Sequence, residues 1–370
     1  MLYKEYGKTG KKVSVIGFGG MRFLKEYSIH DSAQVVRRAS ELGINYFDTA
    51  PIYCDGTSEE IFGEAFKDMP HPFYVSTKSM LRMDPTADDV RRRIEKSLKR
   101  LGVDRITFYH MWSILDLNQY RRVISPGGPY EGALKAKEEG LIEHIVCSTH
   151  CNGSEIEIMV DEGYFEGFTL GYNIINFPFR EKGLKAAYNK GYGVVTMNPL
   201  GGGVIPQNPQ YFEYIKERED QSVAEAAIRF NAAHKEISVV LTGMGTIQEV
   251  EQNAAAVEGL YDITDEKLVQ MKNRINMGMN SLCTGCNYCT DCPEGIAVSK
   301  YMDAYNYKIL GRPDEAMLNR LKNQWNMPLN KQSAIHRCIA CGQCEEVCTQ
   351  RLPIIERLNY IKSAGLQNGG

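Results

Sequence analysis

The chain has 370 residues, a mass of 41.7 kDa, a formal net charge of −3 and a pI of about 6.2. This length accommodates one α/β barrel of roughly 250 residues plus an appended unit, and the charge gives no electrostatic footprint for nucleic acid or an anionic membrane. The amino terminus lacks the apolar core of a signal peptide, and no run approaches the ~20 apolar residues of a membrane span. We therefore expect a cytoplasmic protein with no nucleic-acid or membrane partner.

Strand and helix patterns alternate along most of the chain. Residues 3–15 predict a β-hairpin turned at Thr9 and Gly10, residues 13–21 predict the first barrel strand, and Asp31 is expected to cap the first helix. Further strands are expected at residues 46–50, 73–78, 106–112, 142–150, 168–173, 193–199 and 237–243, with helices at 56–66, 86–101, 130–140, 154–162, 181–190 and 222–234. Eight βα units predict an α/β fold of the closed parallel (β/α)8 TIM-barrel type.

The domain organisation follows from where this alternation stops. Residues 113–129 predict a loop beside the barrel cavity, and residues 246–276 predict the eighth helix and one extra helix. The barrel domain is therefore expected to span residues 1–276. A second, α-helical domain is expected at 277–370, with a helical insertion at 299–327.

Three consecutive predicted strands bring ionisable side chains to one rim. Asp48 ends the second strand, and Tyr53 follows five residues later. Lys78 ends the third strand, and His110 lies near the end of the fourth. The sites of such barrels gather at the carboxyl ends of the strands. Each residue alone has a simpler reading as an ion pair, a loop aromatic or a core histidine, but the four together favour a catalytic site.

These four residues resemble the catalytic tetrad of the aldo-keto reductases, and the resemblance covers roughly residues 1 to 260. It implies reversible, nicotinamide-linked reduction of a small-molecule carbonyl substrate to an alcohol. Tyr53 is then the proton donor, and the Lys78 ammonium favours its phenolate and so lowers its pKa. Asp48 holds Lys78 in place, and His110 orients the carbonyl or relays the proton.

The same resemblance implies a nicotinamide site. Its expected cofactor-binding residues are Ser148, Thr169, Met197, Asn198, Gly243, Glu249 and Asn253. Two of them depart from the family, since Thr169 replaces a glutamine and Met197 replaces the aromatic that stacks on nicotinamide. Residues 241–266 contain no Lys or Arg, and a carboxylate at Glu249 would repel a 2′-phosphate, so NAD(H) is favoured over NADP(H). The alternative is that another loop supplies the basic group.

Eight of the eleven cysteines form two motifs near the carboxyl end: Cys283, Cys286, Cys289 and Cys292, then Cys338, Cys341, Cys344 and Cys348. They resemble the bacterial ferredoxin pattern for two [4Fe-4S] clusters, in which each fourth cysteine ligates the other motif's cluster. One cluster is then held by Cys283, Cys286, Cys289 and Cys348, and the other by Cys338, Cys341, Cys344 and Cys292. The first motif has a shorter last gap, and Thr349 replaces the usual proline. Zinc is the competing metal, although its tetrathiolate sites usually use well-separated CxxC pairs.

The combination resembles the ferredoxin-fused aldo-keto reductases of anaerobic microbes. It implies an oxidoreductase with an external electron carrier, such as a ferredoxin or flavodoxin. Hydride transfer moves two electrons together and needs no one-electron relay, so three hypotheses stay open. The clusters exchange electrons between the carrier and the barrel, or they are structural or oxygen-sensing. Alternatively, the protein is an electron-transfer or binding protein whose barrel lacks ordinary nicotinamide turnover.

Overall fold

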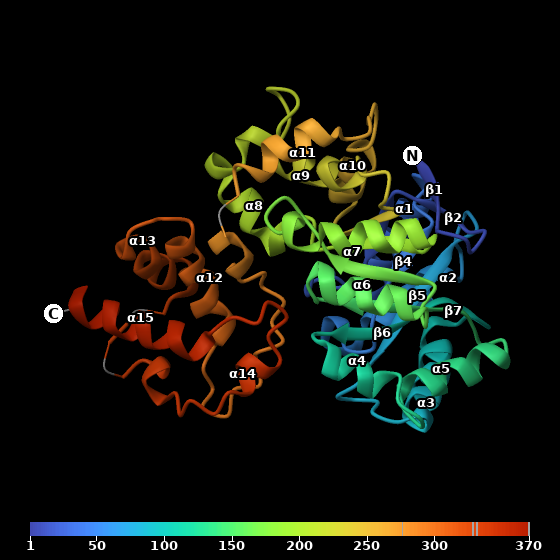
Figure 1. Cartoon of the computed structure of the whole chain (residues 1–370), viewed down its shortest axis with the longest axis horizontal. Helices are drawn as coiled ribbons and strands as arrows, with labels where there is room; N and C mark the ends of the chain where they lie inside the picture. The colour runs from blue at the N-terminus through green and yellow to red at the C-terminus, as the bar shows by residue number, and fades with distance from the viewer. Residues whose placement is uncertain (276, 328, 331, 369–370) are drawn as a thin grey trace. The chain divides into compact units, whose positions relative to one another are not determined.

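The computed structural model describes residues 1–275, 277–327, 329–330 and 332–368 (Figure 1). The chain forms two compact units, the first made of residues 1–200 and 208–269 and the second of residues 201–207 and 270–370. The predicted domain boundary at residue 276 lies outside the described residues. Among the helices of the described part, none is both long and apolar enough to cross a membrane.

The first unit is a closed parallel barrel, which confirms the predicted fold class. Its strands are β3 (Ile16–Gly19), β4 (Tyr46–Asp48), β5 (Tyr74–Met80), β6 (Ile106–Ile114), β7 (Ile142–Thr149), β8 (Gly167–Gly171), β9 (Gly193–Met197) and β10 (Val239–Gly243). They follow one another in chain order around the barrel, and β10 closes it by pairing with β3. All carboxyl ends therefore meet at one face.

Helices surround the strands (Figure 1). They are α1 (Ile29–Glu41), α2 (Ser58–Phe66), α3 (Ala87–Leu101), α5 (Pro129–Glu138), α6 (Gly153–Glu162), α7 (Phe177–Lys190), α9 (Val223–Ala232), α10 (Ile247–Ala255) and α11 (Asp265–Lys272). In α3, Val90, Ile94 and Leu101 are buried at helical spacing, and a capping box of Thr86 and Asp89 fixes the start. Adjacent helices pack in pairs, α1 against α2, α3 against α5, and α6 against α7.

The predicted hairpin forms from β1 (Tyr3–Glu5) and β2 (Lys12–Ser14). It packs against the amino-terminal ends of the barrel strands. Tyr6, in its turn, is fully buried, and its ring centroid lies 4.2 Å from that of Phe108. A side chain at Gly193 would meet the Tyr6 ring at 2.1 Å, so the strand start needs glycine there. Burying one such aromatic contributes ~1.5–3 kcal/mol.

Three local predictions in the first unit were wrong. The first helix is capped by Ser28, and Asp31 instead occupies the third helical position of a capping box. The expected loop at 113–129 contains α4 (Leu117–Val123), because Asp116 accepts a hydrogen bond from the Gln119 amide at 2.8 Å and so caps a helical turn. Helix α7 begins at Phe177, four residues before the predicted start, with a proline in its first turn.

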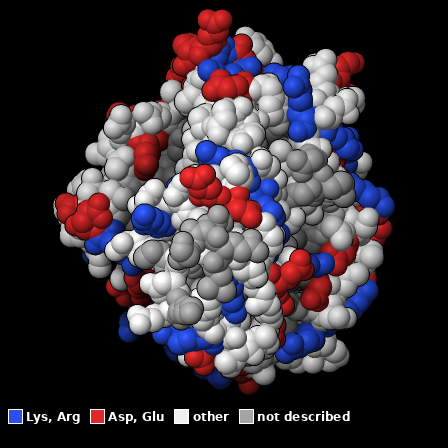
Figure 2. Space-filling view, turned by 90° about the vertical axis from the view of Figure 1, so that its left-hand side faces the viewer, with Lys and Arg blue, Asp and Glu red and all other residues white. Residues whose placement is uncertain are grey.

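The second unit is α-helical around its own core. Its helices are α8 (Val204–Gln207), α12 (Val298–Ile309), α13 (Asp314–Asn319), α14 (Gln343–Glu346) and α15 (Ile354–Asn368), and a π-helical turn spans Arg320–Gln324. The predicted helical insertion is therefore broken after α12, where Gly311 adopts a φ of 76° and Pro313 follows. Basic and acidic side chains are interspersed on the face seen in Figure 2.

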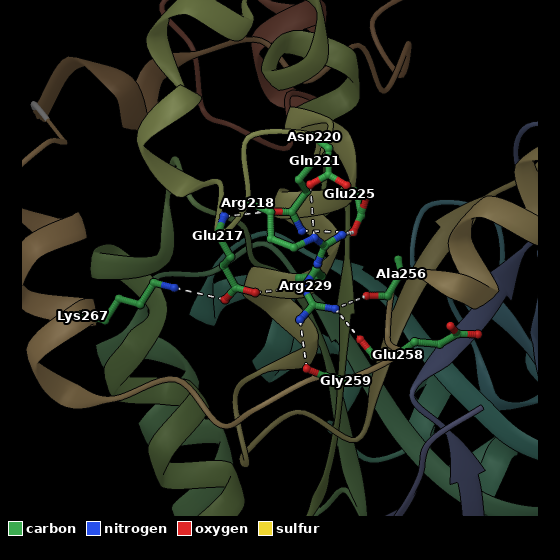
Figure 3. A network of polar contacts seen from close by, with 10 residues as sticks. All are labelled: Glu217, Arg218, Asp220, Gln221, Glu225, Arg229, Ala256, Glu258, Gly259 and Lys267. Carbon is green, nitrogen blue, oxygen red and sulfur yellow. Dashed lines mark hydrogen bonds and ion pairs between the residues drawn. The ribbon is translucent and has the colours of Figure 1, made fainter.

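Arg229 organises a polar network on the outer side of the barrel (Figure 3). Its side chain is buried; Nη1 donates to the carbonyl oxygens of Ala256 and Glu258, both at 2.8 Å. Nε lies 3.0 Å from a carboxylate oxygen of Glu217, whose other oxygen pairs with Lys267 at 3.1 Å. One guanidinium thus ties α9 to the segment after α10 and to the loop before α9.

We expect Arg229→Met to lower the free energy of unfolding by ~3–5 kcal/mol, because the Glu217 carboxylate and the carbonyls lose their buried donor. Lys267→Gln is the matched control, since this lysine is partly exposed and its pair is worth ~1 kcal/mol or less. Chemical denaturation followed by circular dichroism measures both. Equal destabilisation by the two changes would contradict a central role for Arg229.

Candidate active site and cysteine motifs

Asp48 is the centre of a buried polar group at the carboxyl end of β4. Lys78 Nζ forms an ion pair with Asp48 Oδ1, and Ser76 Oγ lies 2.5 Å from the same oxygen. The strand register explains the arrangement. Asp48 pairs with Ser76 across β4 and β5, and Ser76 and Lys78 lie two residues apart and so share one face. Burial lowers the pKa of Lys78, whereas the Asp48 carboxylate acts in the opposite direction.

His110 joins this group from β6, where it pairs in register with Lys78. Its Nε2 lies 3.0 Å from Ser76 Oγ and 3.9 Å from Asp48 Oδ1. Because an ionised carboxylate only accepts, Ser76 donates its hydroxyl proton to Asp48 and accepts from His110. This assigns the proton of the neutral ring to Nε2. Burial and the Lys78 ammonium hold the pKa of His110 well below its usual value, so the ring is neutral at pH 7.

Tyr53 reaches the same group from the turn after β4. Lys78 Nζ lies 5.6 Å from the centroid of the Tyr53 ring, and the Trp112 ring meets it edge-on at 5.5 Å. The next two residues, Cys54 and Asp55, have φ values of 53° and 56°, a conformation that costs non-glycine residues about 1 kcal/mol or more each. The structure therefore brings the four predicted tetrad residues together, and the backbone is strained beside the tyrosine.

Three of the predicted cofactor-binding residues lie on successive strands. Ser148 and Thr169 pair in register across β7 and β8, and both are buried. Thr169 Oγ1 has no hydrogen-bond partner among the described residues. Met197 ends β9, partly buried against the barrel core. The buried Thr169 hydroxyl is available to hydrogen-bond to a carboxamide, so these residues fit a nicotinamide group.

The remaining cofactor-binding candidates lie at the ends of β9 and β10 and on α10. Asn198 has a φ of 64°, and its carbonyl oxygen accepts from Asn173 Nδ2 at 2.9 Å. Glu249 belongs to the capping box of α10; its Oε2 accepts from the Gly245 amide at 2.6 Å. Asn253 lies on α10, half-exposed.

Arg22 is a basic residue that the sequence analysis did not assign to this site. Its side chain packs against Gly243, where an added Cβ would meet Arg22 Cγ at 2.6 Å. The segment after β10 has no basic residue of its own, but Arg22, from the loop after β3, lies beside Gly243. Residues this distant in sequence meet only because the barrel closes between β10 and β3, so no local pattern pointed to Arg22.

The second unit brings together the four cysteines predicted to share one cluster. We call Cys283, Cys286, Cys289 and Cys348 the inner set, because Cys283 is buried and the others are partly buried. The Cys283 thiol interacts electrostatically with the other three, and burial is the main cause that raises its pKa to about 12. Thr349 Oγ1 lies 3.5 Å from Cys286 Sγ, and the Leu352 amide lies 3.4 Å from Cys348 Sγ.

We call Cys338, Cys341, Cys344 and Cys292 the outer set, because Cys341 is exposed. Cys344 interacts electrostatically with Cys338. Across the described residues, no three His, Cys, Asp or Glu side chains converge closely enough to bind a single metal ion. The thiolates of a [4Fe-4S] cluster lie farther apart than the ligands of a single metal ion, since each thiolate binds a different iron. The gathered thiols of the inner set and the hydrogen bonds to their sulfurs fit such a group.

The sequence profile of the Aldo/keto reductase family matches residues 15–274. The chain belongs to this family. A 4Fe-4S dicluster domain matches residues 282–353, so this aldo/keto reductase carries a ferredoxin-type domain at its carboxyl end. The two matches confirm the predicted combination and support iron-sulfur clusters as cofactors.

Known relatives match the barrel of this aldo/keto reductase. L-galactose dehydrogenase from Arabidopsis thaliana is 29% identical over 70% of this chain and 89% of its own length. The uncharacterized oxidoreductase YqkF from Bacillus subtilis is 23% identical over 74% and 96%. Among solved structures, the holo form of aldo-keto reductase AKR11C1 from Bacillus halodurans has a TM-score of 0.63 at 22% identity, over 75% of this chain and 97% of its own. At that identity the likeness shows the fold alone.

Ser76 is a second residue, after Arg22, that no sequence pattern assigned to the site. It bridges Asp48 and His110, although the family resemblance assigned it no role. A signal was present, since Ser76 precedes Lys78 by two residues on one strand and must face the same side. Serine is too common on strands for that spacing alone to single it out.

Proposed function

We propose that this aldo/keto reductase reduces a small-molecule aldehyde or ketone to an alcohol with NADH. The observation that carries the proposal is the buried group of Lys78, Asp48, Ser76 and His110 beneath the Tyr53 ring. Such an arrangement suits a carbonyl oxygen that gains negative charge, because it offers two donors and a buried ammonium in a low-dielectric site.

Each residue has a defined task in this proposal. The nicotinamide, when bound, supplies a hydride to the carbonyl carbon. The Tyr53 hydroxyl donates its proton to the carbonyl oxygen, and Lys78 stabilises the phenolate that remains. Asp48 holds Lys78. When the substrate is bound, the neutral His110 ring donates its Nε2 hydrogen bond to the carbonyl oxygen and no longer to Ser76. This hydrogen bond orients the substrate.

We expect Tyr53→Phe to lower turnover with a carbonyl substrate by ~10²-fold or more, because it removes the general acid. NADH binding, measured by fluorescence, should be unchanged. Tyr261→Phe is the matched control, since this tyrosine is 77% exposed. The assay is NADH oxidation with a panel of aldehydes and ketones. Equal turnover of Tyr53→Phe and the parent would disprove the tetrad roles, and no turnover by the parent would favour an electron-transfer or binding protein.

For the cofactor we propose Ser148 and Thr169 as the carboxamide contacts and Met197 as the apolar face of the nicotinamide site. Gly243, Glu249 and Asn253 would border the adenosine, and Asn198 the cavity. Residues 241–266 lack Lys and Arg, which supports NAD(H) over NADP(H). The Glu249 carboxylate adds negative charge where a 2′-phosphate would lie.

NADH should therefore have a lower dissociation constant than NADPH in a fluorescence titration. Glu249→Gln removes the charge of the carboxylate, so it should reduce the difference between the dissociation constants of NADH and NADPH. Arg22 supplies the internal check, because its side chain packs against Gly243. Tighter binding of NADPH that is lost in Arg22→Gln would refute the NADH preference and identify Arg22 as the phosphate-binding group.

For the second unit we propose two [4Fe-4S] clusters, one held by the inner set and one by the outer set. The gathered thiols of Cys283, Cys286, Cys289 and Cys348 support this cross-ligated pairing. We further propose that an external one-electron carrier, a ferredoxin or a flavodoxin, exchanges electrons with the clusters. Hydride transfer needs no such relay, so this exchange is separate from the carbonyl step.

Cross-ligation predicts that Cys292→Ala disturbs the outer cluster although Cys292 belongs to the first motif. Protein purified without oxygen should carry about eight irons per chain, and Cys292→Ala should retain the inner cubane. Cys54→Ala is the control and should keep the full iron content. Metal analysis with electron paramagnetic resonance tests this. If Cys292→Ala and Cys283→Ala abolish the same signal, each motif binds its own cluster; zinc in place of iron would exclude a redox role.

A further inference from the structure

His150 follows β7 at the carboxyl face of the barrel, and its ring carries a buried nitrogen that makes no hydrogen bond. Nδ1 has no hydrogen-bond partner among the described residues. A buried polar atom left unpaired weakens a fold, so most such atoms in proteins have a partner, and an exception points to strain, to a functional role or to a bound group. His150 Nδ1 is therefore a candidate contact for a ligand.

The strand register places the His150 ring on the inner side of the barrel. Val146 of β7 belongs to the barrel core, and side chains alternate along a strand, so Ser148 and His150 face the same side as Val146. A Cβ added at Gly171, at the end of the neighbouring β8, would lie 3.7 Å from His150 Nδ1. Among the described residues, apart from the chain neighbours of Gly171, no other heavy atom would lie within 4 Å of that Cβ. Nδ1 thus borders the space that this glycine leaves in the barrel mouth.

The residues proposed to hold the nicotinamide border the same space. Gly171 pairs in register with Met197, and Ser148 precedes His150 by two residues. Thr169 precedes Gly171 by two residues and so faces the same side, and its buried Oγ1 also lacks a partner among the described residues. Two buried polar atoms from adjacent strands, an imidazole nitrogen and a hydroxyl oxygen, therefore face the region where we propose that the nicotinamide binds.

Thr149, the residue between Ser148 and His150, does not take part. Its Oγ1 donates to the Ile114 carbonyl oxygen at 2.8 Å and accepts from the Cys151 amide at 3.0 Å, so the turn after β7 uses both the proton and a lone pair of this hydroxyl. The alternation of side chains also turns Thr149 away from the barrel interior. After Ser148, His150 is the next side chain of this segment that faces a ligand inside the barrel.

Arg180, on α7, holds the backbone of His150. Its side chain is 5% exposed, and Nη2 donates to the His150 carbonyl oxygen at 3.3 Å. Burial and, to a smaller extent, the Arg180 guanidinium lower the pKa of His150 to about 3. The ring is therefore neutral at pH 7, so one ring nitrogen donates and the other accepts. A carboxamide has an NH2 donor and a carbonyl acceptor, so it can pair with Nδ1 in either tautomer.

We propose that His150 binds the nicotinamide carboxamide through Nδ1, as a third contact beside Ser148 and Thr169. This inference rests on the proposed nicotinamide function of the barrel. The contact is a hydrogen bond, so it breaks no covalent bond and transfers no proton. A carboxamide held from both β7 and β8 fixes how the nicotinamide ring is turned, and so which of its faces meets the substrate.

Isothermal titration calorimetry of the full chain, purified without oxygen, tests this contact with NAD⁺ and with ADP-ribose, which lacks the nicotinamide. His150→Leu should weaken NAD⁺ binding ~5-fold or more, because the carboxamide loses a buried hydrogen bond. It should leave ADP-ribose binding unchanged. His150→Asn keeps a polar atom two bonds from Cβ, at the place of Nδ1, and should bind NAD⁺ more tightly than His150→Leu.

His234→Leu is the matched control, because His234 is also buried but bonds through both ring nitrogens. Its Nδ1 lies 2.7 Å from the Phe230 carbonyl oxygen, and its Nε2 lies 3.2 Å from the Tyr172 hydroxyl. His234→Leu should lower the thermal unfolding midpoint of the cofactor-free protein and leave the ratio of NAD⁺ to ADP-ribose affinity unchanged. His150→Leu should not lower that midpoint, because it removes an atom that makes no hydrogen bond.

Unchanged NAD⁺ affinity in His150→Leu, or an equal loss for NAD⁺ and ADP-ribose, would overturn the role of His150. A loss of thermal stability as large as that of His234→Leu would also overturn it, because His150 would then be a structural histidine. NAD⁺ binding by His150→Asn that is no tighter than by His150→Leu would exclude a contact at Nδ1. A parent that binds neither compound would overturn the proposed nicotinamide function itself, and this inference with it.

Discussion

The buried ion pair of Lys78 and Asp48 is the interaction on which the rest of the barrel site depends. Two charges out of water are tolerated only when each satisfies the other, and removing one partner from such a pair costs ~3–5 kcal/mol. Ser76 donates to the Asp48 oxygen that Lys78 also contacts, and His110 donates to Ser76. The direction of each hydrogen bond follows from this one carboxylate, so Lys78, Ser76 and His110 are held in fixed positions around it.

The strand register and the turn after β4 set the positions of the site's side chains. Parallel strands in fixed register set Asp48 beside Ser76 and Lys78 beside His110. The turn that carries Tyr53 is strained at its next two residues, and such strain persists only where surrounding structure imposes it. The hairpin around Tyr6 fills the opposite end of the barrel, which keeps the strands that carry the site packed on both sides.

The second unit uses electrostatics in a different way. The barrel neutralises the buried Lys78 ammonium with Asp48, whereas Arg357 of the second unit is held by a carbonyl oxygen and an aromatic ring. The Asn306 side chain adds rigidity, because it both accepts from the Cys283 amide at 2.7 Å and donates to the Cys283 carbonyl oxygen at 2.8 Å. These two hydrogen bonds fix the backbone at the first cysteine of the first motif.

The sequence by itself determined the barrel, the helical second unit and the gathering of Asp48, Tyr53, Lys78 and His110, because these depend on periodic patterns and on strand ends that any closed parallel barrel collects at one face. It did not determine the caps, the start of α7 or the helix within residues 113–129, which depend on single hydrogen bonds and local packing. Only the tertiary structure revealed Ser76 as a bridge, Arg22 against Gly243 and Arg357 against the Ser281 carbonyl and the Tyr305 ring. Those contacts join residues far apart in the chain, or involve one of many side chains of the same type. Three-dimensional packing determines which of these residues meet, so no local sequence pattern indicates them.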